Sequence, residues 1–333
     1  MENTNDNSVI IEPEETPKGK KINKKSAIIA AVSAVAIAAL CLIIIFATGS
    51  RFIKNGDGYK LISSRNKQGV TETTVDCVKG NKSKPVNAIS SGAFGSNTTL
   101  EIIKIGADVK EIGEDAFRNC TKLKQIKVNK NNEYFCDIDG VLFDKKASRI
   151  ICYPAAYADY LTEKFHYDEK ENEEEKGKYY SDDVLSYTIP ETVKVIGRRC
   201  FEGSGIVSLM IPYSVETIEE RAFYNCTGLE TIISYSGSER TYSLSSGVKT
   251  IGKEAFANDG RIIYFYISAS VESIGSRAFA GTGTRTDIEI ESEKAFSVEL
   301  SEKEFKEKVT AGKNWYPDKY ENVNFGVKRT VNK

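Results

Sequence analysis

The sequence is poor in the residues that most catalytic and metal sites require. It has one histidine, His166, and none of its seven cysteines forms a Cys-x-x-Cys pair. Histidine-dependent hydrolases and the common zinc sites need more of these side chains, or need them at short spacing. His166 lies in the charged stretch EKFHYDEK, where we expect a solvated loop residue. The composition therefore predicts a protein that is not an enzyme and that uses no metal or cofactor.

The sequence also lacks an excess of charge of either sign. The formal net charge is −1, so no basic surplus predicts a nucleic-acid partner. The one strongly charged stretch, residues 163–183, holds nine acidic and four basic residues. It lacks the D-x-D-x-D-G spacing of a calcium loop. We therefore expect a solvated loop there rather than a cation site.

The sequence does contain one segment that is repeated several times. SVETIEERAFYNCTGLETI at 214–232 has counterparts at 108–126, 247–265 and 270–288. The shared plan is V-x-x-I-G-x-x-A-F-x-x-C-x-x-L-x-x-I-x-I, and successive anchor phenylalanines lie 23, 84, 22, 33 and 23 residues apart. In-phase copies of a short unit predict a stacked repeat, interrupted here by two insertions. The anchors are Phe94, Phe117, Phe201, Phe223, Phe256 and Phe279.

The apolar positions of each copy alternate as they do in strands. Ile126 and Val128 are one such pair, and Leu209 and Ile211 are another. Because a unit of 23 residues cannot bury such a face alone, the pattern predicts a mainly β solenoid of about six turns with short parallel strands. Each Phe should fill the space between successive turns. The glycines that follow the second short strand should adopt positive φ; they are Gly113, Gly197, Gly252 and Gly275.

This plan resembles the treponemal-type, BspA-like leucine-rich repeats of bacterial surface proteins, over roughly residues 60–290. Residues 131–154 are similar to a hairpin insertion that is common in that family. The resemblance implies a cell-surface or secreted protein that binds other proteins or host surfaces. The sequence departs from the motif where Asn97, Ser204, Asp259 and Thr282 replace its cysteine, and where Ser90 and Glu219 replace its glycine.

Cys120, Cys200 and Cys226 occupy core positions of the repeat, where a cysteine is a small apolar residue. Cys136 and Cys152 flank the predicted hairpin and could pair across it.

The stretch CDIDGVLFD at 136–144 is similar to the D-x-D-G-x-L motif of haloacid-dehalogenase-type phosphatases, which would make Asp137 the nucleophile and Asp139 the acid/base. It lacks the doubly wound setting of that motif, and Asp139-Gly140 favours a plain hairpin turn.

A long apolar stretch precedes the repeats. Residues 26–50 carry no charge, and the 21 residues from Ala27 to Ala47 suffice to cross a bilayer as a helix. The lysines just before them favour a cytoplasmic N-terminus, although Arg51, Lys54 and Lys60 weaken the asymmetry. The alternative, a cleaved signal peptide, has a shorter apolar core. We therefore predict a single-pass plasma-membrane protein with extracellular repeats.

These signals divide the chain into five parts. We expect a cytoplasmic tail at 1–25, a transmembrane helix at 26–48, and a linker with an N-terminal cap at 49–85. The solenoid spans 86–290, with a hairpin insertion at 129–154 and an acidic insertion at 155–186. A C-terminal cap at 291–333 includes a short helix and Trp315, the only tryptophan, which we expect to pack inside the cap.

The repeat also predicts where a ligand would bind. Residues that alternate with the inward strand residues must point outward. Met210, Ile233, Tyr264 and Tyr266 would then form an exposed apolar strip, and such strips often mark protein interfaces. The alternative is that the two insertions cover this strip.

Two functions of different class follow from these observations. The first is a membrane-anchored extracellular protein, an adhesin or surface receptor, that binds a protein or cell-surface ligand without catalysis. The second is a structural module that organises the cell envelope and has no specific soluble ligand.

Overall fold

The computed structural model describes most of the repeat region of the 333-residue chain. The predicted transmembrane helix at 26–48, His166, Trp315 and nearly all of the C-terminal cap lie outside the described residues. No helix within the described ranges is long and apolar enough to cross a membrane. The described residues are 50–64, 70–78, 80–163, 186–237, 239–241, 244, 247–262, 264–268, 270–282, 287–290 and 323–325.

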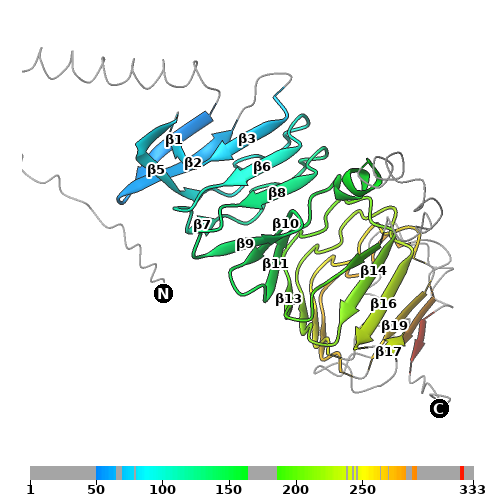
Figure 1. The fold of residues 1–333 in the computed structure, drawn as a ribbon. Helices are drawn as coiled ribbons and strands as arrows, with labels where there is room; N and C mark the ends of the chain where they lie inside the picture. The colour runs from blue at the N-terminus through cyan, green and yellow to red at the C-terminus, as the bar shows by residue number, and fades with distance from the viewer. Residues whose placement is uncertain are drawn as a thin grey trace, which may run out of the picture. The chain divides into compact units, whose positions relative to one another are not determined.

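Strands are the main regular elements of the described chain (Figure 1). Those at its start are β1 (Ser50–Asn55), β2 (Gly58–Ser64), β3 (Glu72–Val75), β4 (Cys77–Val78) and β5 (Asn81–Ile89). The longer repeat strands are β6 (Ile102–Ile105), β8 (Gln125–Val128), β12 (Ser186–Thr188), β14 (Ser208–Pro212), β16 (Thr231–Ser236), β19 (Tyr264–Ile267), β21 (Asp287–Ile290) and β22 (Val323–Phe325).

Shorter strands complete the set. One such strand precedes the anchor phenylalanine in most copies: β7 (Glu111–Ile112), β13 (Val195–Ile196), β15 (Thr217–Ile218), β18 (Thr250–Ile251) and β20 (Ser273–Ile274). The first insertion supplies β9 (Phe135–Ile138), β10 (Val141–Asp144) and β11 (Arg149–Cys152), and the second supplies β17 (Glu239–Thr241).

The longer strands pair in parallel and in the predicted register. Ile103 lies opposite Ile126, and Leu209 lies opposite Ile232. Inward residues such as Ile103, Leu209 and Ile211 are fully buried, because each turn contributes one apolar stripe to a shared core. The mainly β solenoid with short parallel strands, predicted from the alternating pattern, is therefore confirmed.

The glycines after the short strands have a different role from the predicted one. None of Gly113, Gly197, Gly252 and Gly275 is among the positive-φ residues of the described chain, so that prediction was wrong. They are required for lack of space. A Cβ at Gly252 would lie 2.4 Å from the backbone carbonyl carbon of Glu219 in the preceding turn, and the other three would meet backbone atoms at 2.2–2.4 Å. Consecutive turns therefore pack here backbone against backbone.

The phenylalanines stack along the solenoid as predicted. Phe201, Phe223 and Phe256 are fully buried, and their ring centroids lie 4.9 Å apart at both steps. Phe256 and Phe279 are 5.5 Å apart with nearly parallel rings. The residue before each Phe is Ala or, once, Cys200, and all are buried. This column of stacked rings runs through the centre of the core formed by the third to sixth copies.

A three-bond backbone ladder accompanies the ring column. In the fourth copy of the repeat, whose anchor is Phe223, the N–H groups of Arg221, Phe223 and Asn225 donate to carbonyls of the next turn at 2.8–2.9 Å. The residues two before and two after the Phe have positive φ, +57° at Arg221 and +60° at Asn225. These turning points, rather than the glycines, provide the reversal of the chain that the motif requires.

The first insertion is a β-meander that separates two apolar cores. β9 and β10 pair antiparallel through Asp139 (φ +51°) and Gly140 (φ +91°), which form the hairpin turn that the sequence predicted. Val141 and Phe143 belong to the larger cluster, which contains the later repeats, and Leu142 belongs to the cluster of the first two. Strand β10 therefore has apolar contacts on both faces.

Residues 157–163, at the start of the acidic insertion, form a short helix that the sequence analysis did not anticipate. Ala156, Tyr157 and Ala158 are buried, so this part of the insertion belongs to the core. Tyr157 contacts Tyr153 edge to face at 5.1 Å. Residues 164–185, which hold most of the acidic side chains, lie outside the described residues.

Candidate functional site

The phosphatase-like motif lies in a hairpin rather than at the end of a parallel strand. Asp137 is on β9, and its Oδ1 accepts the Val128 N–H at 2.6 Å. Asp139 occupies the turn itself. The Asp137 side chain thus ties the hairpin to β8, which is a structural role.

The cysteines are free thiols in the described chain. Cys120, Cys200 and Cys226 are buried, and burial raises the pKa of Cys120 to about 11, which keeps its thiol protonated. Cys136 and Cys152 lie on β9 and β11, on opposite sides of β10. Two strand spacings of about 4.8 Å exceed the reach of a disulfide, so the pairing considered from sequence does not form.

Metal binding finds no support in the described residues. Within these ranges, no three His, Cys, Asp or Glu side chains come together in a way that could hold a metal ion.

The structure brings together two of the four residues predicted to form an apolar strip. Met210 on β14 lies directly opposite Ile233 on β16, and both are half-buried between buried neighbours. They therefore lie side by side on the outer face of one sheet. Tyr264 and Tyr266 alternate correctly on β19, but their side chains lie outside what the structure describes.

The second insertion changes the continuity of this face. β17 pairs antiparallel with β16 and takes the edge where the next repeat strand would have paired. β19 instead begins a separate sheet with β21 and β22. The strip is therefore divided between two sheets at β17, a feature that the 33-residue step between phenylalanines could have suggested.

A second candidate site lies where the repeat is interrupted, between the second turn, which contains Phe117, and the third turn, which contains Phe201. Among the described residues, the backbone hydrogen bonds that join successive turns elsewhere are missing between these two turns. Within the described chain, the N–H groups of Asp115, Phe117 and Asn119 donate none of the three ladder bonds that the third, fourth and fifth copies make. Phe117 stacks on Phe94 at 5.7 Å but has no ring partner on its other side among the described contacts. The turn that would have covered it is replaced by the insertion.

The gap is a cavity of about 620 Å³. Its floor is apolar, formed by half-buried Ile112, Phe135, Ile151 and Cys152 beside the ring of Phe117. On the far side the Tyr153 ring stacks on Phe201 at 4.7 Å, and the Tyr153 N–H donates to the Cys200 carbonyl at 2.9 Å. Tyr153 therefore takes the place of one missing Phe, but only on the side of the third turn.

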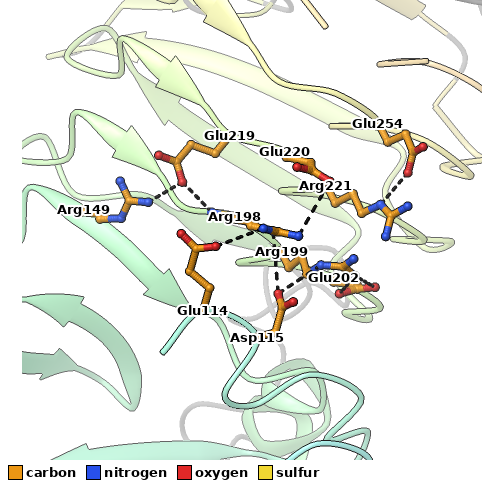
Figure 2. Close-up of polar contacts among 10 residues, drawn as sticks. All are labelled: Glu114, Asp115, Arg149, Arg198, Arg199, Glu202, Glu219, Glu220, Arg221 and Glu254. Atoms are coloured by element: carbon orange, nitrogen blue, oxygen red, sulfur yellow. Dashed lines mark hydrogen bonds and ion pairs between the residues drawn. The ribbon is translucent and has the colours of Figure 1, made fainter. Parts of the chain in front are cut away.

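A network of ion pairs bridges the rim of this junction (Figure 2). Arg198 contacts Glu114 across the gap at 3.0 Å. The carboxylate of Glu219 accepts the Arg198 backbone N–H at 2.9 Å and pairs with the Arg149 guanidinium. Glu219 is one of the two departures from the glycine of the motif, so this departure supplies an acid to the network.

The inner part of the network is largely buried. The Arg199 side chain is 7% exposed and lies between Asp115, at 3.1 Å, and Glu202, at 2.7 Å. Within the described residues, Asp115 Oδ1, Arg198 Nε and Arg199 Nε are buried and form no hydrogen bond, but they pair with one another as ions: Asp115 Oδ1 lies 3.1 Å from Arg199 Nε and 3.9 Å from Arg198 Nε. Buried polar atoms almost always have a partner, and here the Asp115 carboxylate provides one for both guanidinium groups.

Sequence reasoning missed this junction. Asp115 and Arg199 both have positive φ, +60° and +54°, at the position two before the Phe. Charged residues at that position in most copies were a signal that could have been noticed, and the 84-residue step marked where the repeat breaks.

A comparison with family models supports the repeat. A family model described as BspA type leucine-rich repeat region matches six copies over residues 76–148 and 175–308. A search of curated proteins found no match.

Among solved structures, the pneumococcal vaccine antigen PcpA is similar at 19% identity and a TM-score of 0.47, covering 79% of this chain and 68% of that one. A leucine-rich cell surface protein from Faecalibacterium prausnitzii is similar at 22% identity and a TM-score of 0.44, covering 74% and 62%. The chain thus spans about two thirds of each of these proteins.

Proposed function

Because this chain belongs to the BspA-type leucine-rich repeat family, we propose that it is a membrane-anchored extracellular protein that binds a protein or cell-surface ligand without catalysis. In this proposal residues 26–48 cross the plasma membrane, the N-terminus is cytoplasmic and the repeats face outward. The binding face is the outer surface of the longer repeat strands, including Met210, Ile233, Tyr264 and Tyr266.

The observation that carries the proposal is the adjacency of Met210 and Ile233. These apolar side chains are opposite one another on β14 and β16 and are only half-buried. Apolar residues that gather on an open sheet face are a common feature of protein interfaces. The buried thiols, whose pKa is raised by burial at Cys120, Cys200 and Cys226, offer no nucleophile that would favour an enzyme.

Site-specific photo-crosslinking on intact cells tests the binding face. A photoreactive residue at Ile233 should capture a partner protein, and the same residue at Thr250 should not. Thr250 is a suitable control because it is also half-buried on a strand, but on the sheet of short strands. Equal capture at both positions, or retention by the cell wall regardless of position, would favour the envelope-organising alternative.

Topology needs a separate measurement. Protease added to intact cells should degrade the repeats and spare an epitope placed at the N-terminus. Loss of the epitope with survival of the repeats would reverse the orientation and remove the basis for an extracellular ligand.

A further inference from the structure

The gap between the second and third turns has two walls with complementary hydrogen-bonding groups. On one wall, the N–H groups of Asp115, Phe117 and Asn119 have no partner within the described chain. In the fourth copy the equivalent groups of Arg221, Phe223 and Asn225 all donate to the following turn. The first wall therefore presents three donors at alternate residues.

The other wall presents acceptors. In the fourth copy the carbonyls of Glu220, Ala222 and Tyr224 all accept bonds from the third turn. The equivalent carbonyls of the third turn are those of Arg198, Cys200 and Glu202. Only that of Cys200 has a partner among the described residues, the Tyr153 N–H. A molecule that accepts on one side and donates on the other would satisfy both walls, and a polypeptide backbone does so at every residue.

The charges of the gap favour a neutral ligand over an anion. Arg198 and Arg199 are paired with Glu114 and Glu202 at 3.0 and 2.7 Å. An anion would compete with carboxylates already in place, whereas a peptide backbone would add bonds without displacing them. The cavity volume of about 620 Å³ is within the range of 300–1,000 Å³ typical of ligand pockets.

The floor of the gap selects for side-chain type. Ile112, Phe135 and Ile151 are half-buried there, beside the Phe117 ring, which borders the cavity and is 9% exposed. An apolar side chain that entered the gap would cover this surface, as the next Phe does in every regular step of the ring column.

We propose that this gap is a peptide-binding site. It takes a segment of about five residues of another protein, whose alternate carbonyls accept the N–H groups of Asp115, Phe117 and Asn119 and whose apolar side chain lies on Phe117. The site replaces the missing turn with a turn from a partner, a form of the strand addition by which other domains bind peptides. It is independent of the sheet face proposed above, since it lies in the row of anchor turns.

Hydrogen exchange of the full-length chain tests the premise. The amides of Asp115, Phe117 and Asn119 should exchange faster than their counterparts Phe223 and Asn225, which are hydrogen-bonded. If all of them exchange equally slowly, the three donors are already paired and the proposal is overturned.

The fifth turn of the chain supplies a probe peptide. Residues 250–260, TIGKEAFANDG, carry the three carbonyls that accept bonds from the fourth turn. The synthetic peptide at millimolar concentration should slow exchange at Asp115, Phe117 and Asn119 about fivefold or more, as one hydrogen bond worth about 1 kcal/mol would. A scrambled peptide should not.

Two tryptophan variants separate binding in the gap from binding elsewhere. Ile112→Trp should fill the floor and abolish the slowing by the peptide. Ile274→Trp, at the equivalent half-buried position of the sixth copy, should leave it unchanged. An unchanged response in Ile112→Trp would place the peptide elsewhere. No slowing by the peptide, or slowing by inorganic phosphate alone, would overturn the peptide site, and the second result would identify an anion site.

Discussion

Phe223 and Phe117 occupy the same position in two turns but have different surroundings, so the same truncation should cost different amounts. Phe223 is fully buried between two rings, each 4.9 Å away. Phe117 is 9% exposed, has one ring neighbour among the described residues, at 5.7 Å, and borders the cavity at the junction. The pair therefore tests both the ring column and its interruption.

The magnitudes follow from packing. Phe→Ala in a core costs about 3–5 kcal/mol, and an aromatic pair adds about 0.5–1.5 kcal/mol. Phe223→Ala loses two pairs and leaves an enclosed void, so about 5 kcal/mol is expected. Phe117→Ala loses one pair and opens into existing space, so about 3 kcal/mol is expected. The difference of about 2 kcal/mol corresponds to about thirtyfold in the local opening equilibrium.

Hydrogen exchange of the neighbouring turns measures this difference, because the stability of a solenoid is roughly a sum over repeats and their interfaces. Amides next to Phe223 should lose more protection in the Phe223→Ala variant than amides next to Phe117 lose in the Phe117→Ala variant. Equal losses, or a larger loss at Phe117, would mean that the junction is packed as tightly as the regular turns.

Three further variants test other contacts. Gly252→Ala should destabilise the chain in urea titration, because its Cβ would lie 2.4 Å from backbone, whereas Gly260→Ala, with no atom within 4 Å, should be nearly neutral. Asp259 is buried, and burial holds the pKa of its carboxyl well above the usual range. The folded state thus binds its proton more tightly than the unfolded state, so the stability it contributes is present below about pH 4 and is lost as pH rises through the raised folded pKa. The unfolding free energy of Asp259→Asn minus that of the natural chain should therefore shrink as pH falls from 7 toward 4, and a constant difference would contradict the burial effect. Arg199→Met leaves two nearby carboxylates largely without their cation and should cost about 3–5 kcal/mol in denaturant titration, against less than about 1 kcal/mol for Arg261→Met, whose side chain is 63% exposed.

The sequence predicted the features that depend on local periodicity. The alternation at Ile103 and Ile105 and the repeated Phe gave the strands, their register and the ring column, because each copy encodes the same contacts with its neighbour. The Asp139-Gly140 turn was equally clear, since that dipeptide has a strong conformational preference. The burial of Asp259 at a cysteine position also follows from the phase of the repeat.

Features that depend on contacts between distant segments were not predictable in the same way. The junction cavity arises because the second and third copies, whose anchor phenylalanines are 84 residues apart, are separated by an insertion whose path no repeat encodes, and Tyr153 of that insertion stacks on Phe201. The division of the predicted strip depends on β17 taking the edge of β16. The role of Gly252 was misassigned because a need for positive φ and a lack of space both select glycine, and only the backbone distance distinguishes them.

The two-sided burial of β10 has a consequence for how its register is chosen. On a strand with one polar face, a slip of one residue exposes apolar groups to water and is rejected on that ground. In β10 a slip would only exchange Leu142 with its neighbours Val141 and Phe143, because both faces are apolar. Hydrophobic patterning is therefore nearly degenerate at this strand. The tight turn at Asp139-Gly140 sets the alignment instead, so the information that assigns each side chain to its core resides in the backbone conformations of two turn residues that belong to neither apolar cluster.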